Sequence, residues 1–416
     1  MKKLYENIIL LAIIKGLEYL LSFITFPYLT RVLQVEMFGT IVFAQGLINY
    51  FTLFTDYGFN LLGPKEIAQN DEADKRSRVF AKIFFAKLLL LLIATVVFIT
   101  GIFCLNLYFK VDVLLYTVVF LTVIGNVMFP VWFFQGIQQM LYITLVNVIA
   151  RFCSIAGIFY FVKQPQDYIL AALFQAIVPL VAGICSWVIL VKNFSEVLCL
   201  PTFDEVRNTL KEGWGIFAST VAINLYTASN VVFLGFLTNP VTVGYFSGAK
   251  KIIDNITQLI SPISQAVYPH ISKLVTQSSK EVKPFLEKVL LILGGGTFIG
   301  SVFIFIFADF IVKILLGNGY EQSVLLLRIM AFLPFIIAMS NVFGIQIMLP
   351  FGMQSTFSRI LICAAALNTC MVLPLIYFWQ NIGVSISIVA TECFVTLMMY
   401  YTLRKNKILV IRRNSI

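Results

Sequence analysis

The sequence predicts an all-α integral membrane protein of about twelve transmembrane helices, arranged as two sets of six. Three observations predict this class: a high apolar content, a series of apolar stretches long enough to span a bilayer, and one long polar connection near the middle of the chain. Of the 416 residues, 60% are hydrophobic and only 12% are charged, and the mean hydropathy is +0.93. These values lie outside the range of soluble domains and within that of polytopic membrane proteins.

Twelve apolar stretches are long enough for a membrane span. A helix needs about 20 apolar residues to cross the hydrocarbon core, because every backbone polar group must be satisfied inside the segment. In chain order, the predicted spans are 7–33, 37–62, 79–105, 113–134, 141–162, 168–191, 214–237, 241–271, 285–308, 322–349, 356–378 and 382–403. We take the first as a retained helix rather than a signal peptide, because no small-residue cleavage site follows it.

The longest polar connection, 192–213, falls between the sixth and seventh spans. It predicts an N-terminal six-helix lobe (1–191), a cytosolic linker (192–213) and a C-terminal six-helix lobe with a basic cytosolic tail (214–416), which is typical of two-lobed transporters. The two lobes also share a short similarity that hints at an internal duplication. Aligning 33–48 with 238–253 pairs three identical residues, namely Gly39 with Gly244, Ala44 with Ala249 and Ile48 with Ile253.

The distribution of basic residues predicts the orientation of the spans. If both termini are cytosolic, the cytosolic connections hold 17 Lys and Arg residues, whereas the opposite connections hold three. This asymmetry follows the positive-inside rule. The formal net charge of +10 is therefore mostly topological. It does not indicate a nucleic-acid partner, because no soluble module carries a basic stripe interleaved with stacking aromatics.

Several charged residues fall inside the predicted spans. A charge near the bilayer centre costs about 2.5–3.5 kcal/mol on insertion scales, so such residues should face the bundle interior or a wet cavity. The candidate cavity cations are Arg31, Lys87, Arg151, Lys250, Lys251 and Arg328, and the acids that could carry a coupling H⁺ or Na⁺ are Asp56 and Glu392.

These candidates differ in how well a structural role explains them. Arg31 follows Pro27, and a proline-broken helix is where transporters often open backbone to a cavity, although Arg31 is also close enough to the external end to snorkel. Arg151 lies in the middle of its span with no acid within a turn. Lys250 and Asp254 are four residues apart, so a local ion pair is an equal alternative for this lysine.

The surplus of cations predicts an anionic ligand. The planar fork of arginine matches phosphate oxygens, so a phosphate-bearing substrate fits best. Polar and aromatic side chains on nearby spans are candidate sugar contacts, although helix-packing hydrogen bonds alone explain most of them individually. They are Tyr28, Gln45, Asn49, Tyr50, Asn60, Asn126, Gln175, Asn224, Tyr226, Asn230, Gln265 and Asn341.

The sequence predicts no catalytic residues, no metal site and no cofactor other than a coupling ion. Its seven cysteines are odd in number and scattered through apolar runs, which indicates neither a disulfide framework nor a zinc site. The glycine-rich stretch LGGGTF (293–298) lacks the Lys–Ser/Thr ending and the preceding strand of a phosphate-binding loop.

Several stretches, taken in order along the chain, carry a resemblance to a known family. They are TFPYLTRVL, MFGTIVFAQGLINYF, DYGFNLLGPKEIA, WFFQGIQQM, ISQAVYPHIS, GNGYEQSVLLLRIMAFLPF, SNVFGIQIMLP and ATECFVT. Together they resemble the bacterial O-antigen flippases, the polysaccharide transporter branch of the superfamily of multidrug, oligosaccharidyl-lipid and polysaccharide exporters. The resemblance covers residues 7–403.

The resemblance implies two six-helix lobes around a central cavity, in the bacterial inner membrane with both termini cytosolic. The implied substrate is an undecaprenyl-diphosphate-linked O-antigen repeat unit, moved from the cytosolic to the periplasmic leaflet by alternating access. Besides membrane lipids, the implied partners are the O-antigen polymerase and a chain-length regulator of lipopolysaccharide biosynthesis. Arg31, Lys87, Arg151, Asp56 and Glu392 lie in segments that look like the family's own pattern.

Three alternatives remain open. A flippase for another lipid-linked saccharide, such as a peptidoglycan precursor, enterobacterial common antigen or a capsule unit, would look the same in sequence. A cation-coupled drug exporter of the same superfamily would have an acid-rich cavity. An intramembrane glycosyl polymerase or ligase would have a large periplasmic loop, whereas the longest external loop predicted here is 309–321.

Overall fold

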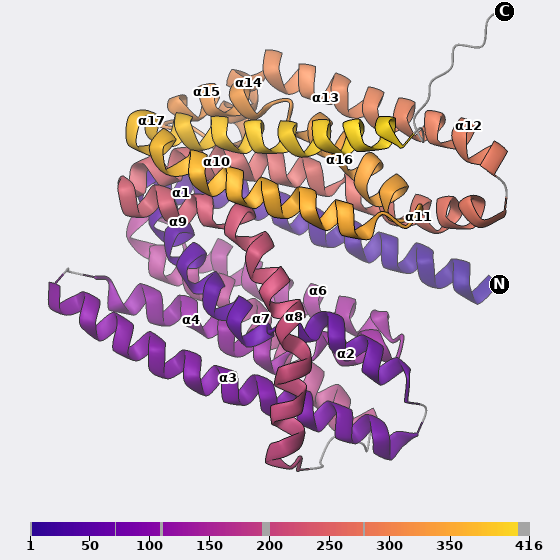
Figure 1. Cartoon of the computed structure of the whole chain (residues 1–416). Helices are drawn as coiled ribbons and strands as arrows, with labels where there is room; N and C mark the ends of the chain where they lie inside the picture. Colours follow the sequence, from indigo (N-terminus) through magenta and orange to yellow (C-terminus); the bar gives the residue numbers. More distant parts are fainter. Residues whose placement is uncertain (1, 71, 109–110, 194–199, 278, 407–416) are drawn as a thin grey trace, which may run out of the picture. The chain divides into compact units, whose positions relative to one another are not determined.

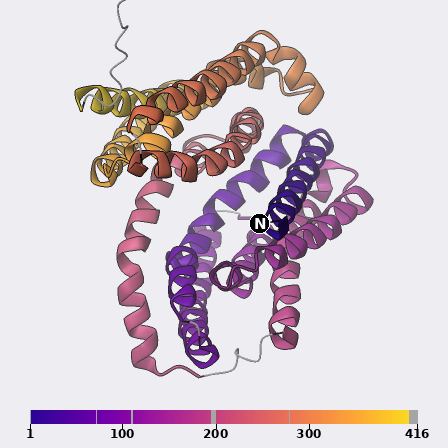
Figure 2. The same ribbon diagram turned by 90° about the vertical axis from the view of Figure 1, so that its right-hand side faces the viewer.

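A computed structural model of the chain describes residues 2–70, 72–108, 111–193, 200–277 and 279–406. Within these ranges the chain is helical almost throughout and contains no strand, which confirms the predicted all-α class (Figures 1 and 2). It divides into two compact units, Met1–Val221 and Ala222–Ile416. Parts of the predicted linker (194–199) and of the predicted tail (407–416) lie outside the described residues.

The first unit is built around aromatic side chains from several helices. Its elements are α1 (Lys2–Asp56), α2 (Phe59–Ala68), α3 (Ala73–Tyr108), α4 (Val113–Met128), α5 (Val131–Gly136), α6 (Met140–Phe161), the 3₁₀ turn η1 (Pro165–Asp167), α7 (Tyr168–Asn193) and most of α8 (Phe203–Thr227). Trp132 and Phe133 on α5 are fully buried, and both rings lie 5.3 Å from the ring of Phe80 on α3. The short helix α5 is therefore an anchor of this core.

The second unit is interrupted by two π-helical segments. Its elements are the end of α8, α9 (Ser229–Leu237), α10 (Pro240–Gln258), α11 (Ile260–Gln277), α12 (Ser279–Val289), the π-helix η2 (Leu290–Gly294), α13 (Gly295–Ile306), α14 (Ala308–Leu315), α15 (Glu321–Met330), α16 (Leu333–Asn341), the π-helix η3 (Val342–Met348) and α17 (Gln354–Lys405). A core cluster joins Ile347 and Met348 of η3 to Met399 and Leu403 of α17. A π-helical segment often marks a functional site, because its extra residue widens the turn.

Two residues break the longest helices where the sequence predicts junctions between spans. Gln34 in α1 has φ 59° and ψ 179°, and Gln380 in α17 has φ 46° and ψ −122°. They fall in the predicted junctions 34–36 and 379–381, and Figure 1 shows the two halves of α17 folded back on each other. Pro27 lies inside α1, so the residue that leaves helical geometry is Gln34 and not the predicted proline.

Eight segments of the described chain are long and apolar enough to cross a membrane. Phe23–Ala68 covers the end of the first predicted span and all of the second, and Gln354–Lys405 covers the last two. The other six segments each correspond to one predicted span. The predicted spans 214–237 and 241–271 correspond to α8–α11, which are interrupted and more polar.

One face of α3 is suited to contact lipid. Leu92, Val96, Ile99 and Phe103 are all exposed, and their spacing of three and four residues places them on the same side of the helix. Exposed apolar side chains in such numbers indicate a hydrocarbon surrounding rather than water. Together with the other apolar segments, they make the chain a multi-pass membrane protein.

The positions of the predicted internal similarity are packed alike. All six of its residues are buried: Gly39, Gly244, Ala44, Ala249, Ile48 and Ile253. Equal burial is what equivalent packing positions require, since a small or branched residue is needed where helices meet. The duplication itself stays a prediction.

Candidate functional site

A buried ion pair joins two of the predicted residues in the first unit. The Lys87 Nζ atom on α3 lies 2.8 Å from the Asp56 Oδ1 atom at the end of α1. Only 1% of the Lys87 side chain is exposed, against 29% for Asp56. A buried ammonium without a partner would be very costly, so this pairing is what permits Lys87 to lie inside the unit. Lys87 therefore has a charge partner at rest.

The backbone around Asp56 holds its carboxylate in place. Helix α1 ends there because Tyr57 (φ 46°) and Gly58 (φ 82°) both have left-handed backbone conformations. A Cβ atom at Gly58 would lie 2.5 Å from the side chain of Ile216, so α8 also requires glycine at this position. The ring of Phe217 stacks on Tyr57 with centroids 4.6 Å apart. These contacts fix the turn that presents Asp56 to Lys87.

A charged cavity in the second unit brings together another pair of predicted residues. It has a volume of about 250 Å³ and is lined by Lys250 and Asp254 of α10, Glu392 of α17, and neutral residues that include Asn230, Asn368 and Thr391. Lys250 donates a hydrogen bond to Asp254 one turn along the same helix. The predicted local ion pair is thus present, and it lies in a cavity beside Glu392.

The kinked helix α17 supplies a polar wall of this cavity. The Asn368 amide before the kink donates to Ser387 Oγ at 3.1 Å and to Thr391 Oγ1 at 3.2 Å after the kink. Gly383 allows the two halves to approach closely, because a Cβ atom there would lie 2.0 Å from the backbone oxygen of Leu375. The hairpin therefore fixes Thr391 and its neighbour Glu392.

The charge balance of this cavity differs from that of a purely cationic pocket. Among the described residues that line it, two carry a carboxylate and one carries an ammonium group. Lys250 thus lies close to two acidic side chains, one on its own helix and one on α17. Three charged side chains of the described residues therefore line one small cavity.

The remaining predicted cations lie elsewhere in their units. Arg31, Lys251 and Arg328 are exposed, and Arg151 is partly buried. As far as the described residues define the cavities, none of these four lines the charged cavity or the larger cavity beside it. Their proposed contacts with an anionic substrate stay predictions.

Some of the predicted sugar contacts line these two cavities, and others do not. Asn230 lines the charged cavity and Asn341 lines the larger one. Tyr28 donates to the backbone oxygen of Val162, and Gln45 bonds to Gln175, so these side chains hold helices together. The side chains of Tyr226 and Gln265 lie outside the described residues.

Two residues of the charged cavity were not singled out from the sequence. Asn368 and Thr391 lie within apolar spans, where each looks like an isolated polar residue. The available signal was the pair Ser387 and Thr391, two hydroxyl side chains one helical turn apart, which indicates a polar face on an otherwise apolar helix. Their partner Asn368 could not be assigned without the hairpin.

Comparisons with known proteins cover nearly the whole chain. The profile of the family described as "Polysaccharide biosynthesis protein" matches residues 4–275. A protein of Escherichia coli (strain K12) named "Putative O-antigen transporter" is 38% identical over 411 residues, or 98% of each chain. A Shigella dysenteriae protein of the same name is 31% identical over 399 residues, which is 95% of this chain and 98% of that protein.

Two solved structures share the fold at low sequence identity. An inward-facing multidrug resistance MATE family transporter of the MOP superfamily aligns with a TM-score of 0.69 at 13% identity, over 95% of this chain and 100% of that one. The lipid II flippase MurJ in its inward closed conformation aligns with a TM-score of 0.73 at 12% identity, over 95% of this chain and 87% of that one. The fold is therefore that of the MATE-like exporters.

Proposed function

Because the chain belongs to the polysaccharide biosynthesis protein family, we propose that it is a flippase for undecaprenyl-diphosphate-linked O-antigen repeat units. It would move them from the cytosolic to the periplasmic leaflet of a bacterial inner membrane, with both of its own termini in the cytosol. The observation that carries this proposal is the 38% identity, over 98% of both chains, to a relative named as an O-antigen transporter. The relatives and the proteins of similar fold are transporters and not enzymes.

The chemistry of the substrate explains why a protein is needed. A hydroxyl group transferred from water to hydrocarbon without a hydrogen-bond partner costs about 4–8 kcal/mol, and each sugar carries several. The polyprenyl tail is apolar and stays in the bilayer throughout. The protein therefore has to supply a polar path for the sugars and charge compensation for the diphosphate.

The interior lysines support a route for the diphosphate. Lys87 and Lys250 each have a carboxylate partner in the described structure. In an alternating-access cycle, a diphosphate oxygen would replace Asp56 or Asp254 as the partner of the lysine, so the ammonium group would not be left unpaired. Arg31, Arg151, Lys251 and Arg328 would attract the diphosphate along other parts of the path.

Glu392 and Asp56 are the proposed sites of coupling to H⁺ or Na⁺. A proton or sodium ion at Glu392 would remove one of the two negative charges that face Lys250, and this would strengthen the Lys250–Asp254 pair. The membrane potential, negative inside, adds about 2.3 kcal/mol per uncompensated negative charge per 100 mV in the outward direction. After translocation, the O-antigen polymerase and its chain-length regulator would use the repeat unit.

Complementation of a flippase-null strain tests the proposal. We expect the expressed chain to restore surface O-antigen, and a Lys250→Ala variant of equal membrane abundance to restore at most a tenth as much, since loss of a charge-assisted contact costs about 1.5–3 kcal/mol. Without a functional flippase, the repeat units should stay on the cytosolic side. Single repeat units on lipid A core would instead indicate a polymerase defect and contradict the proposal.

One observation favours a second candidate, a cation-coupled drug exporter. The charged cavity holds more carboxylates than ammonium groups among its described residues, and a cationic drug would find partners there. A drug-efflux assay in a pump-deficient strain separates the two functions. The flippase proposal predicts no change in resistance to cationic drugs. A strain that needs a flippase for peptidoglycan precursor, common antigen or capsule would show whether another saccharide is carried.

A further inference from the structure

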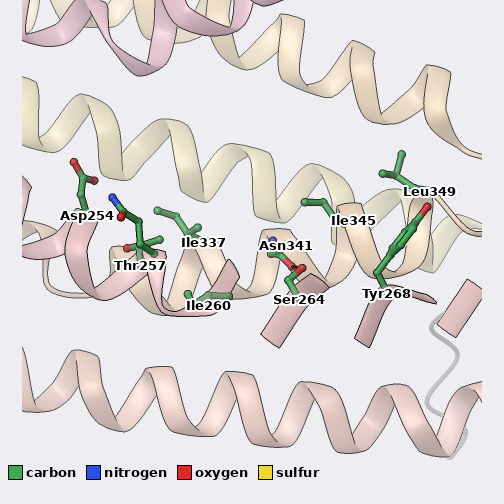
Figure 3. A pocket seen from close by; sticks show the side chains of 10 residues that line it. Asp254, Thr257, Ile260, Ser264, Tyr268, Ile337, Asn341, Ile345 and Leu349 are labelled. Atoms are coloured by element: carbon green, nitrogen blue, oxygen red, sulfur yellow. Dashed lines mark hydrogen bonds between the residues drawn. The ribbon is translucent and has the colours of Figure 1, made fainter. Parts of the chain in front are cut away.

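A larger cavity lies next to the charged one within the second unit. It has a volume of about 700 Å³, inside the range of roughly 300–1,000 Å³ that is usual for small-molecule sites. Its described lining combines polar groups with an aliphatic wall formed by Ile260, Ile337, Ile345 and Leu349. Figure 3 shows Asp254 at one end and Tyr268 at the other, with Ser264 and Asn341 between them.

A relay of hydrogen bonds fixes the polar groups in the middle of this cavity. The Gln346 amide nitrogen, which is fully buried, donates to Ser264 Oγ at 2.6 Å and to the Ser264 backbone oxygen at 2.9 Å. The Ser264 hydroxyl in turn donates to Asn341 Oδ1 at 2.7 Å. Asn341 accepts with its oxygen, and no described residue accepts from its two amide N–H donors, so these donors are available to a ligand.

The π-helix η3 creates this arrangement. Asn341 is the last residue of α16, and Gln346 lies five residues later, inside η3. The backbone hydrogen bonds of a π-helix join residues five apart, one residue further than in an α-helix, and here the side chains of Asn341 and Gln346 both contact Ser264. Gln346 can therefore support Asn341 through Ser264 of the neighbouring helix α11. A buried relay behind a cavity-lining amide is typical of a preorganised binding site.

The two cavities share residues. Asp254 and Ile337 line both of them, so the larger cavity adjoins the cavity that holds Lys250 and Glu392. Among the described residues that line the larger cavity, the one charged side chain is Asp254. The lining of the larger cavity is thus neutral to acidic, and the basic group, Lys250, lies in the adjoining cavity.

We propose that the larger cavity is a saccharide subsite that takes a neutral sugar residue of the transported repeat unit, an inference that rests on the proposed flippase function. Asn341, Thr257 and Gln258 would hydrogen-bond the hydroxyl groups of the sugar. The ring of Tyr268 and the aliphatic wall would cover its C–H face. Asp254 disfavours a uronic acid here, because two carboxylates in one small site repel each other. The diphosphate would lie toward Lys250 in the adjoining cavity.

Binding of two lipids to the purified full-length protein in lipid nanodiscs tests this subsite. The probes are undecaprenyl diphosphate, which has no sugar, and the repeat-unit lipid extracted from flippase-null cells. We expect the wild type to bind the sugar-bearing lipid more tightly. Asn341→Ala and Tyr268→Ala should each reduce this preference by about tenfold, the value of one or two good hydrogen bonds or a stacking contact, and leave the affinity for the sugar-free lipid unchanged.

Matched variants give the controls. Asn147→Ala, on α6 of the first unit, changes the same residue type outside the described lining of both cavities and should leave both affinities at the wild-type level. Tyr268→Phe keeps the ring, so it should lose less of the preference for the sugar-bearing lipid than Tyr268→Ala. Lys250→Met should weaken the binding of both lipids equally, because it removes a contact with the diphosphate that both lipids carry. Thermal unfolding of each variant shows that it is folded.

The outcomes separate the two proposals. If Asn341→Ala and Tyr268→Ala are folded and keep the wild-type preference for the sugar-bearing lipid, the saccharide subsite is wrong. The same conclusion follows if these variants weaken both lipids equally, or if the wild type binds both lipids equally while it still transports the repeat unit. A wild type that binds neither lipid overturns the flippase proposal and the subsite with it.

Discussion

Lys87 on α3 places its ammonium nitrogen 2.8 Å from the carboxylate of Asp56, the residue at which α1 ends. The lysine is almost fully buried, whereas the aspartate side chain is partly exposed. The first unit therefore contains a cation that is charge-compensated at rest and whose partner is the more accessible group. Under the proposed function, an entering diphosphate would compete with Asp56 for Lys87.

Removal of one partner of this pair should destabilise the protein. Asp56→Asn leaves a buried ammonium group without a carboxylate, and we expect a loss of about 3 kcal/mol in the free energy of unfolding. The double variant Lys87→Met with Asp56→Asn should recover most of this loss, because no buried charge remains. Denaturation of the purified protein in detergent measures both values.

An exposed pair provides the control for that experiment. Lys75 and Glu72 lie 3.0 Å apart with side chains 59% and 69% exposed. Lys75→Met should change the unfolding free energy by less than about 1 kcal/mol, since surface ion pairs contribute little. A double variant as unstable as Asp56→Asn alone would show that the Lys87–Asp56 interaction is not what supports α1 against α3.

Coupling through Glu392 predicts a separable effect on transport. In proteoliposomes, Glu392→Gln should retain basal movement of the repeat-unit lipid. The stimulation of this movement by an imposed proton or sodium gradient should be about tenfold smaller than in the wild type. The reason is that glutamine cannot bind or release the ion that changes the charge facing Lys250. Glu321→Gln, at an exposed acid on α15, is the matched control. Full gradient stimulation in Glu392→Gln would exclude this residue as the coupling site.

Gly383 should tolerate no side chain. A Cβ atom there would lie within 2.4 Å of two backbone atoms of Leu375, so Gly383→Ala forces the two halves of α17 apart. We expect the free energy of unfolding to fall by about 3 kcal/mol, because overpacking against backbone cannot be relieved by a rotamer change. The wall that α17 gives to the charged cavity should be disrupted as well. Gly300→Ala meets nothing within 4 Å and should be neutral or slightly stabilising. The measurement is thermal unfolding of both variants in the same detergent.

The start of α8 should depend on pH. The Glu205 carboxylate accepts hydrogen bonds from the backbone N–H of Thr202 at 2.7 Å and from its hydroxyl at 3.0 Å. These bonds, the backbone one first, lower the pKa of Glu205 below its ordinary value. The ionised Glu205 carboxylate therefore stabilises the start of α8 fully above the unfolded-state pKa of about 4.3. This stabilisation is lost as the pH falls through the lower folded-state pKa.

Hydrogen exchange measures that effect. The protection factors of the Thr202, Glu205 and Val206 amides should fall as the pH drops below about 4, whereas Glu205→Gln should be less protected at neutral pH and show no such decrease. Arg207→Gln, on the exposed side of the same helix turn, is the control. Wild-type protection that stays constant down to about pH 3 would contradict the capping role of Glu205.

The fold was largely predictable because hydropathy and span length directly reflect the membrane. The positions of Gln34 and Gln380 were also predictable, since each lies in a short junction between two apolar runs. The break expected at Pro27 was wrong, because a proline in a long helix can be accommodated while the chain remains helical.

Individual residues of the site were predictable from the sequence, but most of the contacts between them were not. Lys87, Asp56, Lys250 and Glu392 stood out because charge is rare in apolar spans. Their pairing was not readable, since Lys87 and Asp56 are 31 residues apart and meet only when α1 and α3 pack. The relay from Gln346 through Ser264 to Asn341 depends on a π-helix, which has no recognisable pattern in a single sequence. The larger cavity, which we propose as the saccharide subsite, could therefore be found only from the structure.

The most direct test of the central claim is a flipping assay with purified protein. Proteoliposomes carry the repeat-unit lipid, and an externally added lectin reports the fraction of sugar that reaches the outer leaflet. We expect the protein to expose lumenal repeat units to the lectin within minutes, whereas protein-free liposomes expose only those that began outside. If the folded, reconstituted protein leaves that fraction at the protein-free level with and without a membrane potential, the chain is not a flippase for this lipid.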